Sequence, residues 1–445
     1  MDEIYNNACN IIDTWQQSYS ITNDVRRLLL SCYGLTKLPP LPNCSILYLY
    51  QIHIKNLLNL PNSLIDLTID SMEYLTEINK LPDKLEILTI YNCINLYTLP
   101  LLHSNITYLY LNNLSILSIP YLSYNLNHID LTNCDYLTEI PKIPNGVKKL
   151  KITNCPLLNV LELSGPIDYL YIIESNIKEI ITNDCNVKNI YIKEMNELIE
   201  LPDSITKSLI SCEIIKCNKL QKIGDFSELG LLTKLYIESC ELLSLNRILP
   251  DSITNLYLNN VNIAINTFPY MLRELQLINC NLIEEIILSP NSIFINIYGC
   301  NNLVSISPLP QLTDEFILDT CNKIVHLPKL NNKLSKLLIK NCISIEKLPD
   351  LPDSLIELNC NNITISELPE FLPNSLGILL LFDTQINRLP NTLPNTLRFI
   401  GISRTNITNL PNNLPQCLLQ VFASKSCLTQ TELLRLRNNG ITVSI

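Results

Sequence analysis

Cysteine and histidine are the residue types of this chain with the widest range of possible chemical roles. The sequence has 17 cysteines and 4 histidines among 445 residues. Thiolates and imidazoles bind metals, act as nucleophiles or bases, or form disulfides, and each role needs several such groups at a defined spacing. The histidines lie far apart without ligand spacing, so surface or strand-edge positions are favoured over metal or catalytic roles for His53, His103, His128 and His326.

Most of the cysteines recur at one place in a repeated pattern. The block from Leu85 to Leu96 has the frame L-x-x-L-x-L-x-x-C-x-x-L. We count about nineteen copies spaced about 21 residues apart, which is typical of leucine-rich repeats. The cysteine slot of the frame returns at Cys134, Cys155, Cys240, Cys280 and Cys342, with degenerate copies around Cys217, Cys300 and Cys321.

The frame predicts that these cysteines are buried, reduced thiols and not a reactive group. Thiols in apolar surroundings have a raised pKa and react poorly. Two weaker alternatives stay open, because neighbouring rungs of such a stack lie about 4.8 Å apart: a ladder of thiols that binds metal, or oxidation between adjacent rungs. We expect no catalytic residue, no cofactor and no metal site.

The spacing of apolar residues predicts the fold. The L-x-L core has a period of two, which indicates a short strand with one buried face, and such strands stack into a parallel sheet around a shared core. Leu-Pro pairs such as Leu60-Pro61 and Leu351-Pro352 favour an extended or 3₁₀ return arm. We therefore predict a curved leucine-rich-repeat solenoid with a concave parallel β-sheet and an extended or 3₁₀ convex side.

Both ends have the pattern of short helical caps, which a solenoid needs to cover its terminal rungs. Residues 2–17 place Ile4, Ala8, Ile11, Ile12 and the single tryptophan, Trp15, on one helical stripe. Thr429 to Glu432 reads as a capping box, and Gly440 stands where a helix ends. We predict an N-terminal helical cap in residues 1–25, one repeat array in 26–428, and a C-terminal capping helix and tail in 429–445.

Charge and hydropathy narrow the classes of partner. The net charge of −10 argues against nucleic acid, whose binding needs a basic surface. No stretch approaches the ~18 apolar residues of a membrane span, and the acidic, polar start lacks the features of a secretory signal. We expect a monomer in a reducing, cytoplasmic compartment, and signal-independent export into a host cell stays open.

Aromatic and aliphatic residues occupy the outward positions of the predicted strands. Exposed aromatic side chains are typical of protein interfaces, although tyrosine and isoleucine also have a high intrinsic strand propensity. We hypothesise that a protein partner binds these residues on the concave face: Tyr108, Tyr110, Tyr169, Tyr171, Tyr191, Tyr236, Tyr257, Ile378, Leu380, Phe382 and Phe399.

The Leu-Pro arms, short repeats and N-terminal helix with its tryptophan resemble the bacterial effector class of leucine-rich repeats, the YopM and IpaH type. Matching residues run from Leu38 to Pro42 and from Leu348 to Leu355. The Asn/Ile-rich repeats with cysteine in the turn also resemble the leucine-rich gene family of AT-rich large DNA viruses of insects. Ubiquitin ligases of the effector class carry a Cys-x-Asp motif, which this sequence lacks, so the resemblance implies no ligase activity.

These features favour a non-catalytic protein–protein interaction module, with a host factor as the partner if the source is a virus or pathogen. The alternative is a substrate receptor or adaptor that recruits a ubiquitin ligase or kinase.

Overall fold

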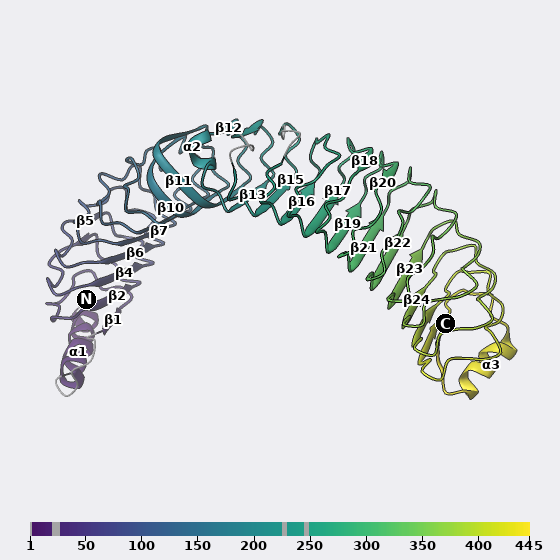
Figure 1. The fold of residues 1–445 in the computed structure, drawn as a ribbon. Coiled ribbons are helices and arrows are strands. Elements are labelled where there is room, and N and C mark those ends of the chain that lie inside the picture. Colours follow the sequence, from purple (N-terminus) through teal and green to yellow (C-terminus); the bar gives the residue numbers. More distant parts are fainter. Residues whose placement is uncertain (1, 20–26, 225–228, 244–248) are drawn as a thin grey trace. The chain divides into compact units, whose positions relative to one another are not determined.

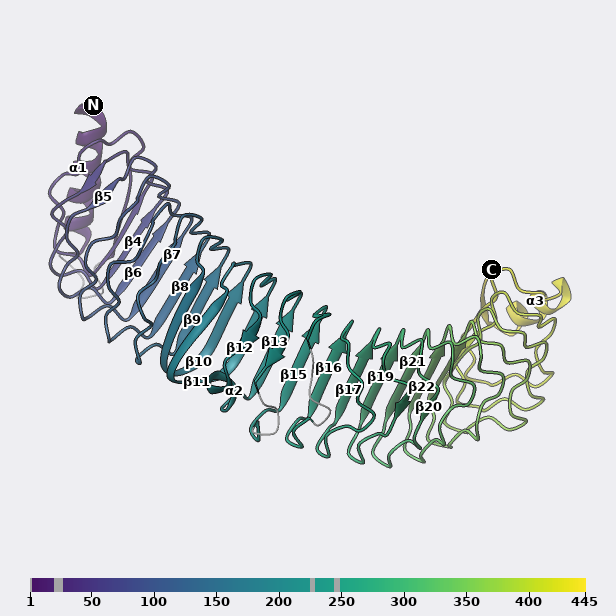
Figure 2. The ribbon, with the colours of Figure 1, turned by 90° about the horizontal axis from the view of Figure 1, so that it is seen from above.

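The computed structural model describes residues 2–19, 27–224, 229–243 and 249–445. The chain is a parallel β-solenoid of about 19 turns with small helices at both ends, as the repeat frame predicts. It divides into two compact units, Met1–Asp225 and Phe226–Ile445. In both units short strands lie side by side and are joined by return arms that are mostly non-helical (Figures 1 and 2).

The first unit begins with helix α1 (Asp2–Tyr19) and continues as a stack of parallel strands. Two neighbouring strands, β10 (Val160–Ile173) and β11 (Glu179–Lys193), are longer than the rest because their return arms also pair with each other, with an irregularity between Ser164 and Pro166. The strands of this sheet are β1 (Arg27–Ser31), β2 (Ile46–Tyr50), β4 (Asp66–Asp70), β6 (Ile87–Tyr91), β7 (Tyr108–Asn112), β8 (His128–Thr132), β9 (Lys149–Thr153), β10 (Val160–Ile173), β11 (Glu179–Lys193) and β13 (Ser211–Ile215).

The second unit repeats this arrangement and ends in helix α3 (Gln430–Asn438). The tail predicted after this helix is a final strand that pairs with the strand before it. The strands are β15 (Lys234–Glu238), β16 (Asn255–Asn259), β17 (Glu274–Ile278), β19 (Phe294–Tyr298), β21 (Glu315–Asp319), β22 (Lys336–Lys340), β23 (Glu357–Asn361), β24 (Ile378–Leu380), β25 (Phe399–Gly401), β26 (Gln420–Phe422) and β27 (Thr442–Ser444).

The core of each unit is made by the second and fourth residues of the strands. Leu109 and Leu111 of β7 are buried, whereas the flanking positions of the same strand are exposed or half-buried. Because side chains alternate along a strand, the first, third and fifth residues point to the opposite side of the sheet. We call that side the open face.

A left-handed residue follows most strands and turns the chain into the core. Asn92 and Asn341 occupy this position with φ of 53° and 51°, a conformation that asparagine tolerates better than most residues. The amides also form ladders between rungs. Asn341 Nδ2 donates to Asp319 Oδ1 at 2.8 Å, and Asn362 Nδ2 donates to Asn341 Oδ1 at 2.9 Å.

The sequence predicts an extended or 3₁₀ return arm, and many Leu-Pro arms contain a turn with the 3₁₀ hydrogen-bond spacing. In these turns a backbone N–H donates to a proline carbonyl three residues earlier, at 3.2 Å for Leu64 and 3.0 Å for Leu355. The α-helical exception among the described arms is α2 (Asp203–Thr206). Short pairs of strands run along the arms: β3 (Asn56–Leu57) with β5 (Glu77–Ile78), β12 (Glu200–Leu201) with β14 (Lys222–Ile223), and β18 (Glu285–Ile286) with β20 (Ser305–Ile306).

Both helices have the amphipathic character that the sequence predicts. Ala8 and Ile12 of α1 are buried; the side chain of Trp15 lies outside the described residues, so its predicted sealing role stays a prediction. At the other end, Thr429 Oγ1 accepts the N–H of Glu432 at 3.2 Å. The second bond of the predicted capping box is absent, because Glu432 instead accepts the N–H of Leu410 in the last return arm and pairs with Arg435 of its own helix.

Candidate interaction surfaces on the open face of the sheet

The cysteines of the repeat slot belong to the structural frame. Their thiols donate to the carbonyl two residues earlier, as Cys93 Sγ does to Tyr91 O at 3.2 Å. In the turns at Ser175, Thr384 and Thr405, a buried hydroxyl stands where other repeats have the thiol. Burial raises the pKa of Cys93 to about 12, so the thiolate needed for chemistry is not formed at neutral pH. The described residues contain no group of His, Cys, Asp and Glu that could hold a metal ion.

The histidines stand apart from one another and have structural neighbours. His53 packs between Tyr33 and Tyr74, with ring centroids 4.3 and 4.6 Å away. His103 Nε2 lies 2.8 Å from Leu81 O. His128 is on the open face beside Tyr108 and Tyr110, where burial and Lys149 lower its pKa. None of these rings is placed against a nucleophile.

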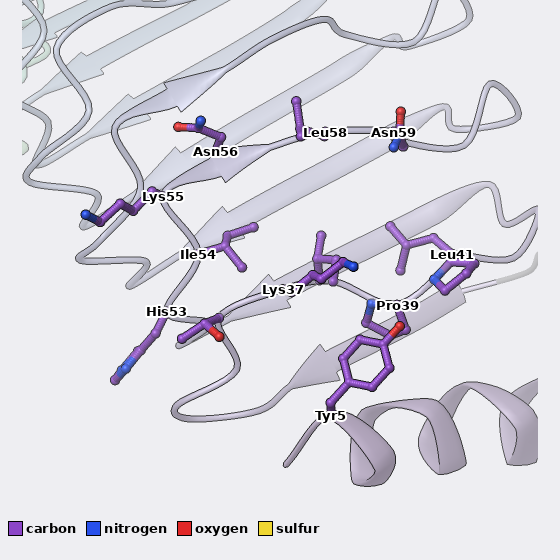
Figure 3. A pocket seen from close by; sticks show the side chains of 13 residues that line it. Tyr5, Lys37, Pro39, Leu41, His53, Ile54, Lys55, Asn56, Leu58 and Asn59 are labelled. Carbon is purple, nitrogen blue, oxygen red and sulfur yellow. The ribbon is translucent and has the colours of Figure 1, made fainter. Parts of the chain in front are cut away.

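A cavity of about 820 Å³ lies between α1 and the first return arms (Figure 3). Tyr5 points from the helix toward Pro39, and Lys37 and Lys55 also line the cavity. No carboxylate lines it. The rest of the lining consists of apolar side chains, His53 and the neutral polar side chains of Thr36, Asn56 and Asn59. This set contains no cysteine or serine nucleophile for His53 to activate.

In the first unit, five of the predicted site residues fall on the open face. Tyr108 and Tyr169 are 37% and 46% exposed, and each stacks on the tyrosine two positions further along its strand, Tyr110 or Tyr171. The ring of Tyr191 lies 6.1 Å from that of Tyr171. Strand alternation thus groups these rings into two separate clusters, one on β7 and one on β10 and β11.

The tyrosine cluster on β10 and β11 lies beside basic residues. Lys149 Nζ is 5.7 Å above the ring of Tyr171. Lys151 Nζ pairs with Asp130 at 3.1 Å. The lysines of β9 are therefore held by an aromatic face and a carboxylate within the sheet, which gives this part of the open face a mixed charge.

In the second unit, the predicted tyrosines form a tightly stacked pair. Tyr236 and Tyr257 occupy matching positions of neighbouring strands, and their rings are parallel with centroids 4.0 Å apart. Tyr236 also donates to Glu238 Oε2 at 2.6 Å. Because these contacts satisfy the pair within the sheet, cross-rung packing accounts for it as well as a partner would.

The predicted apolar residues of the second unit form a continuous group with one further member. Ile378 and Phe399 are direct register partners, as are Leu380 and Gly401. Phe382 fills the space above Gly401 and meets Phe422 edge to face at a centroid distance of 6.5 Å. We name Ile378, Leu380, Phe382, Phe399 and Phe422 the phenylalanine patch; all five side chains are half-buried.

Sequence reasoning missed Phe422 and the residues of a second group. Phe422 is the last residue of a three-residue strand, and its buried neighbours are Val421 and Ala423 in place of leucines, so the leucine frame does not reveal it. In the first unit the missed residues follow the ordinary frame, and the alternation around Leu47 and Leu88 would have found them. Together with Tyr110, which is one of the predicted site residues, they form a group that we name the acidic tyrosine cluster: Tyr48, Tyr91, Tyr110, Asp66, Asp70 and Asp130.

These features together define a leucine-rich-repeat solenoid. It is similar to YopM from Yersinia enterocolitica WA-314, with 19% identity and a TM-score of 0.50 over 95% of this chain and 92% of that one. It is also similar to a leucine-rich-repeat protein of Leptospira interrogans, with 16% identity and a TM-score of 0.51 over 86% of this chain and 95% of that one. At these identities the likeness shows the fold alone.

One curated relative is similar in sequence. The Arabidopsis thaliana protein SUPPRESSOR OF npr1-1, CONSTITUTIVE 1 is 27% identical over 223 residues, which cover 46% of this chain. The match spans 15% of the relative's own length. No protein-family model matches the chain. Among the described residues, no helix is long and apolar enough to cross a bilayer.

Proposed function

We propose that the chain is a non-catalytic interaction module whose open face binds a protein partner. The observation that carries this proposal is the phenylalanine patch, where five apolar side chains gather at outward positions of three neighbouring strands. The core beneath them is already filled by the alternate residues. Clustered apolar side chains on the side of a sheet that faces solvent are typical of a surface that a partner covers.

Charge on the open face favours a protein partner over nucleic acid. A phosphate backbone needs a run of unpaired cations. Here Lys151 pairs with Asp130, and Lys336 pairs with Glu315 at 2.6 Å. Mixed charges around aromatic anchors suit a protein surface better.

The cysteines support a reducing compartment as the place of action. None of the 17 cysteines takes part in a disulfide, and most of the thiols are buried. Disulfides are rare where thioredoxin and glutathione keep thiols reduced. We propose that the chain acts as a monomer in the cytoplasm. If its source is a virus or pathogen that exports it, the partner that we propose is a host factor.

Two chemically different surfaces favour a second candidate function. The acidic tyrosine cluster lies in the first unit and the phenylalanine patch in the second. A protein with two such surfaces can hold two different partners. The second candidate is therefore an adaptor that brings a substrate to a ubiquitin ligase or kinase.

Photo-crosslinking on both sides of the solenoid tests the proposal. A benzoylphenylalanine in place of Phe399 probes the open face, and one in place of Phe371, which is 77% exposed on a return arm, is the matched control. We expect a partner from the natural cell to crosslink at Phe399 and not at Phe371. Mass spectrometry of the product separates the two candidates, since an adaptor also brings down a catalytic subunit.

Alanine substitutions give the second arm of this experiment. Tyr169→Ala removes an exposed ring from the open face, and Tyr121→Ala removes one that is 52% exposed from a return arm. Interface aromatics commonly contribute about 1–4 kcal/mol, so loss of Tyr169 or Phe399 should weaken binding of the partner by about fivefold or more. Crosslinking at Phe371 in place of Phe399, with unchanged recovery by the open-face variants, contradicts the proposal.

A further inference from the structure

We propose that the acidic tyrosine cluster binds an arginine side chain from a cationic, extended segment of a protein partner. This inference rests on the proposed function and adds the chemistry of what the first unit recognises. Its basis is the position of three aspartates among three tyrosine rings on the open face of β2, β4, β6, β7 and β8.

Strand register brings the carboxylates and rings together. Asp70 lies between Tyr50 and Tyr91 in neighbouring rungs, and its Oδ2 accepts the hydroxyl of Tyr48 at 2.6 Å. The two rungs between Tyr48 and Tyr110 carry the small residues Thr68 and Thr89 at the corresponding position. The rings therefore stand on either side of a shallow stretch of sheet.

The negative field of the aspartates converges on Tyr91. Burial raises the pKa of this tyrosine, and Asp70, Asp66 and Asp130 each raise it further. Tyr48 shows the same field more strongly: its hydrogen bond to Asp70 and its burial raise its pKa to about 12. The aspartates, which disfavour a further negative charge here, favour a positive one at the same place, whereas burial disfavours a charge of either sign.

No cation of these five strands neutralises the cluster. Their outward positions carry three aspartates and neither lysine nor arginine. Asp130 is paired with Lys151 of the next strand, and Asp66 lies near Arg27. Asp70 accepts hydrogen bonds from the neutral side chains of Tyr48, Ser71 and Asn92, and it has no ion pair with the described residues.

Aromatic rings beside a carboxylate favour arginine over other cations. The planar guanidinium stacks on a tyrosine face and can give two parallel hydrogen bonds to one carboxylate. The ammonium of lysine is a compact, strongly hydrated charge that gains less from a ring. A metal ion needs several ligating groups in one place, and the described residues contain no such group.

Direct binding of a synthetic peptide to the full chain tests this assignment. The probe is a fluorescein-labelled, amidated peptide of alternating arginine and glycine, measured by anisotropy at low salt and at 0.3 M salt. Its counterparts carry citrulline or lysine in place of arginine. We expect the arginine peptide to bind at least tenfold more tightly than the citrulline peptide, more tightly than the lysine peptide, and less tightly at high salt because screening weakens exposed charge pairs.

Three variants locate the binding. Asp70→Asn keeps an oxygen for the Tyr48 hydroxyl but removes the charge, and Asp66→Asn removes a second charge outside that hydrogen bond. Each should weaken the arginine peptide by about fivefold to tenfold. Glu213→Gln, at an outward position of β13 in the same unit, is the matched control and should leave affinity unchanged. Circular dichroism verifies that each variant is folded.

The outcomes separate this inference from the proposed function. Equal binding of the arginine and citrulline peptides, or unchanged binding by both aspartate variants, overturns the arginine site. If a natural partner still crosslinks at Phe399 in that case, the proposed function stands and only the chemistry of the first unit is wrong. If the arginine peptide binds as expected but no partner crosslinks at Phe399, the arginine site stands and the proposed function is wrong.

Discussion

The ring of Phe382 lies over the α-carbon of Gly401, one rung further along the second unit. A Cβ at Gly401 would lie 2.6 Å from Cζ of Phe382 and 2.9 Å from Cδ2 of Leu380. The glycine therefore leaves the space that lets the phenylalanine patch close over the sheet. This contact connects one missing side chain to the shape of the surface that we propose for binding.

Gly401→Ala should consequently disturb the patch. Overpacking of this kind costs about 1–3 kcal/mol, because Phe382 or the backbone must move. Gly377→Ala is the matched control, since its Cβ would meet only backbone oxygens at 3.7 and 3.8 Å. Urea denaturation should show a lower midpoint for Gly401→Ala alone. Equal midpoints for both variants would mean that Phe382 does not occupy the space over Gly401.

Substitution of Asn359 should stabilise the protein, in contrast to substitution of Gly401. It occupies the outward middle position of β23 between Leu338 and Leu380, is only 5% exposed, and its Oδ1 has no hydrogen-bond partner. An unsatisfied buried polar group costs about 1–3 kcal/mol, so Asn359→Leu should raise the melting temperature. Asn361→Leu should lower it, because Asn361 Oδ1 accepts the N–H of Phe382 at 2.9 Å. Calorimetry that finds both variants destabilised contradicts this assignment.

The sequence predicts the repeat because each rung satisfies the same local demands. Leucine at alternate positions fills the core, and proline sets the return arm. The left-handed residue before the cysteine slot was not recognised, although Asn-Cys pairs such as Asn92-Cys93 and Asn341-Cys342 signal it. Asparagine there provides both the positive φ and the ladder of amide hydrogen bonds.

The site is less predictable because its residues combine across rungs. Tyr48 and Asp70 are 22 residues apart, and only their register brings them within hydrogen-bonding distance. The phenylalanine patch depends in the same way on a contact between rungs. In the sequence, Gly401 indicates only a weakened strand, and its role becomes clear from the position of Phe382 above it. Sequence alternation indicates which side chains face outward, but it does not show which of them meet.

The C-terminal cap predicts a specific loss of stability in acid. Glu432 is 5% exposed. Burial alone would raise its pKa, but hydrogen bonds from Arg435 and the N–H of Leu410 outweigh burial and lower it. A carboxyl whose pKa is lower in the folded state stabilises the protein at pH values above its unfolded pKa of about 4.3. This stabilisation is lost as the pH falls through the folded value.

Glu432→Gln should therefore unfold at a lower temperature than the unmodified chain at pH 7. The difference in unfolding temperature between the variant and the unmodified chain should narrow steadily below about pH 4, where the carboxyl of the unmodified chain is also protonated. Glu346→Gln, an exposed carboxyl on a return arm, is the control and should track the unmodified chain. A gap for Glu432→Gln that is independent of pH would show that the carboxylate charge contributes nothing to the cap.

Thiol reactivity tests whether the cysteines are structural. Cys417 and Cys427 are exposed, whereas the cysteines of the repeat slot are buried, and burial raises the pKa of the slot residue Cys93 to about 12. Under native conditions an aromatic disulfide reagent should modify the two exposed thiols quickly and the slot thiols only as the chain unfolds. The double variant Cys417→Ser/Cys427→Ser should lose the fast phase. In denaturant without reductant the unmodified chain should titrate close to 17 thiols; a much lower value for protein taken directly from its natural cell would indicate disulfides and contradict the reducing compartment.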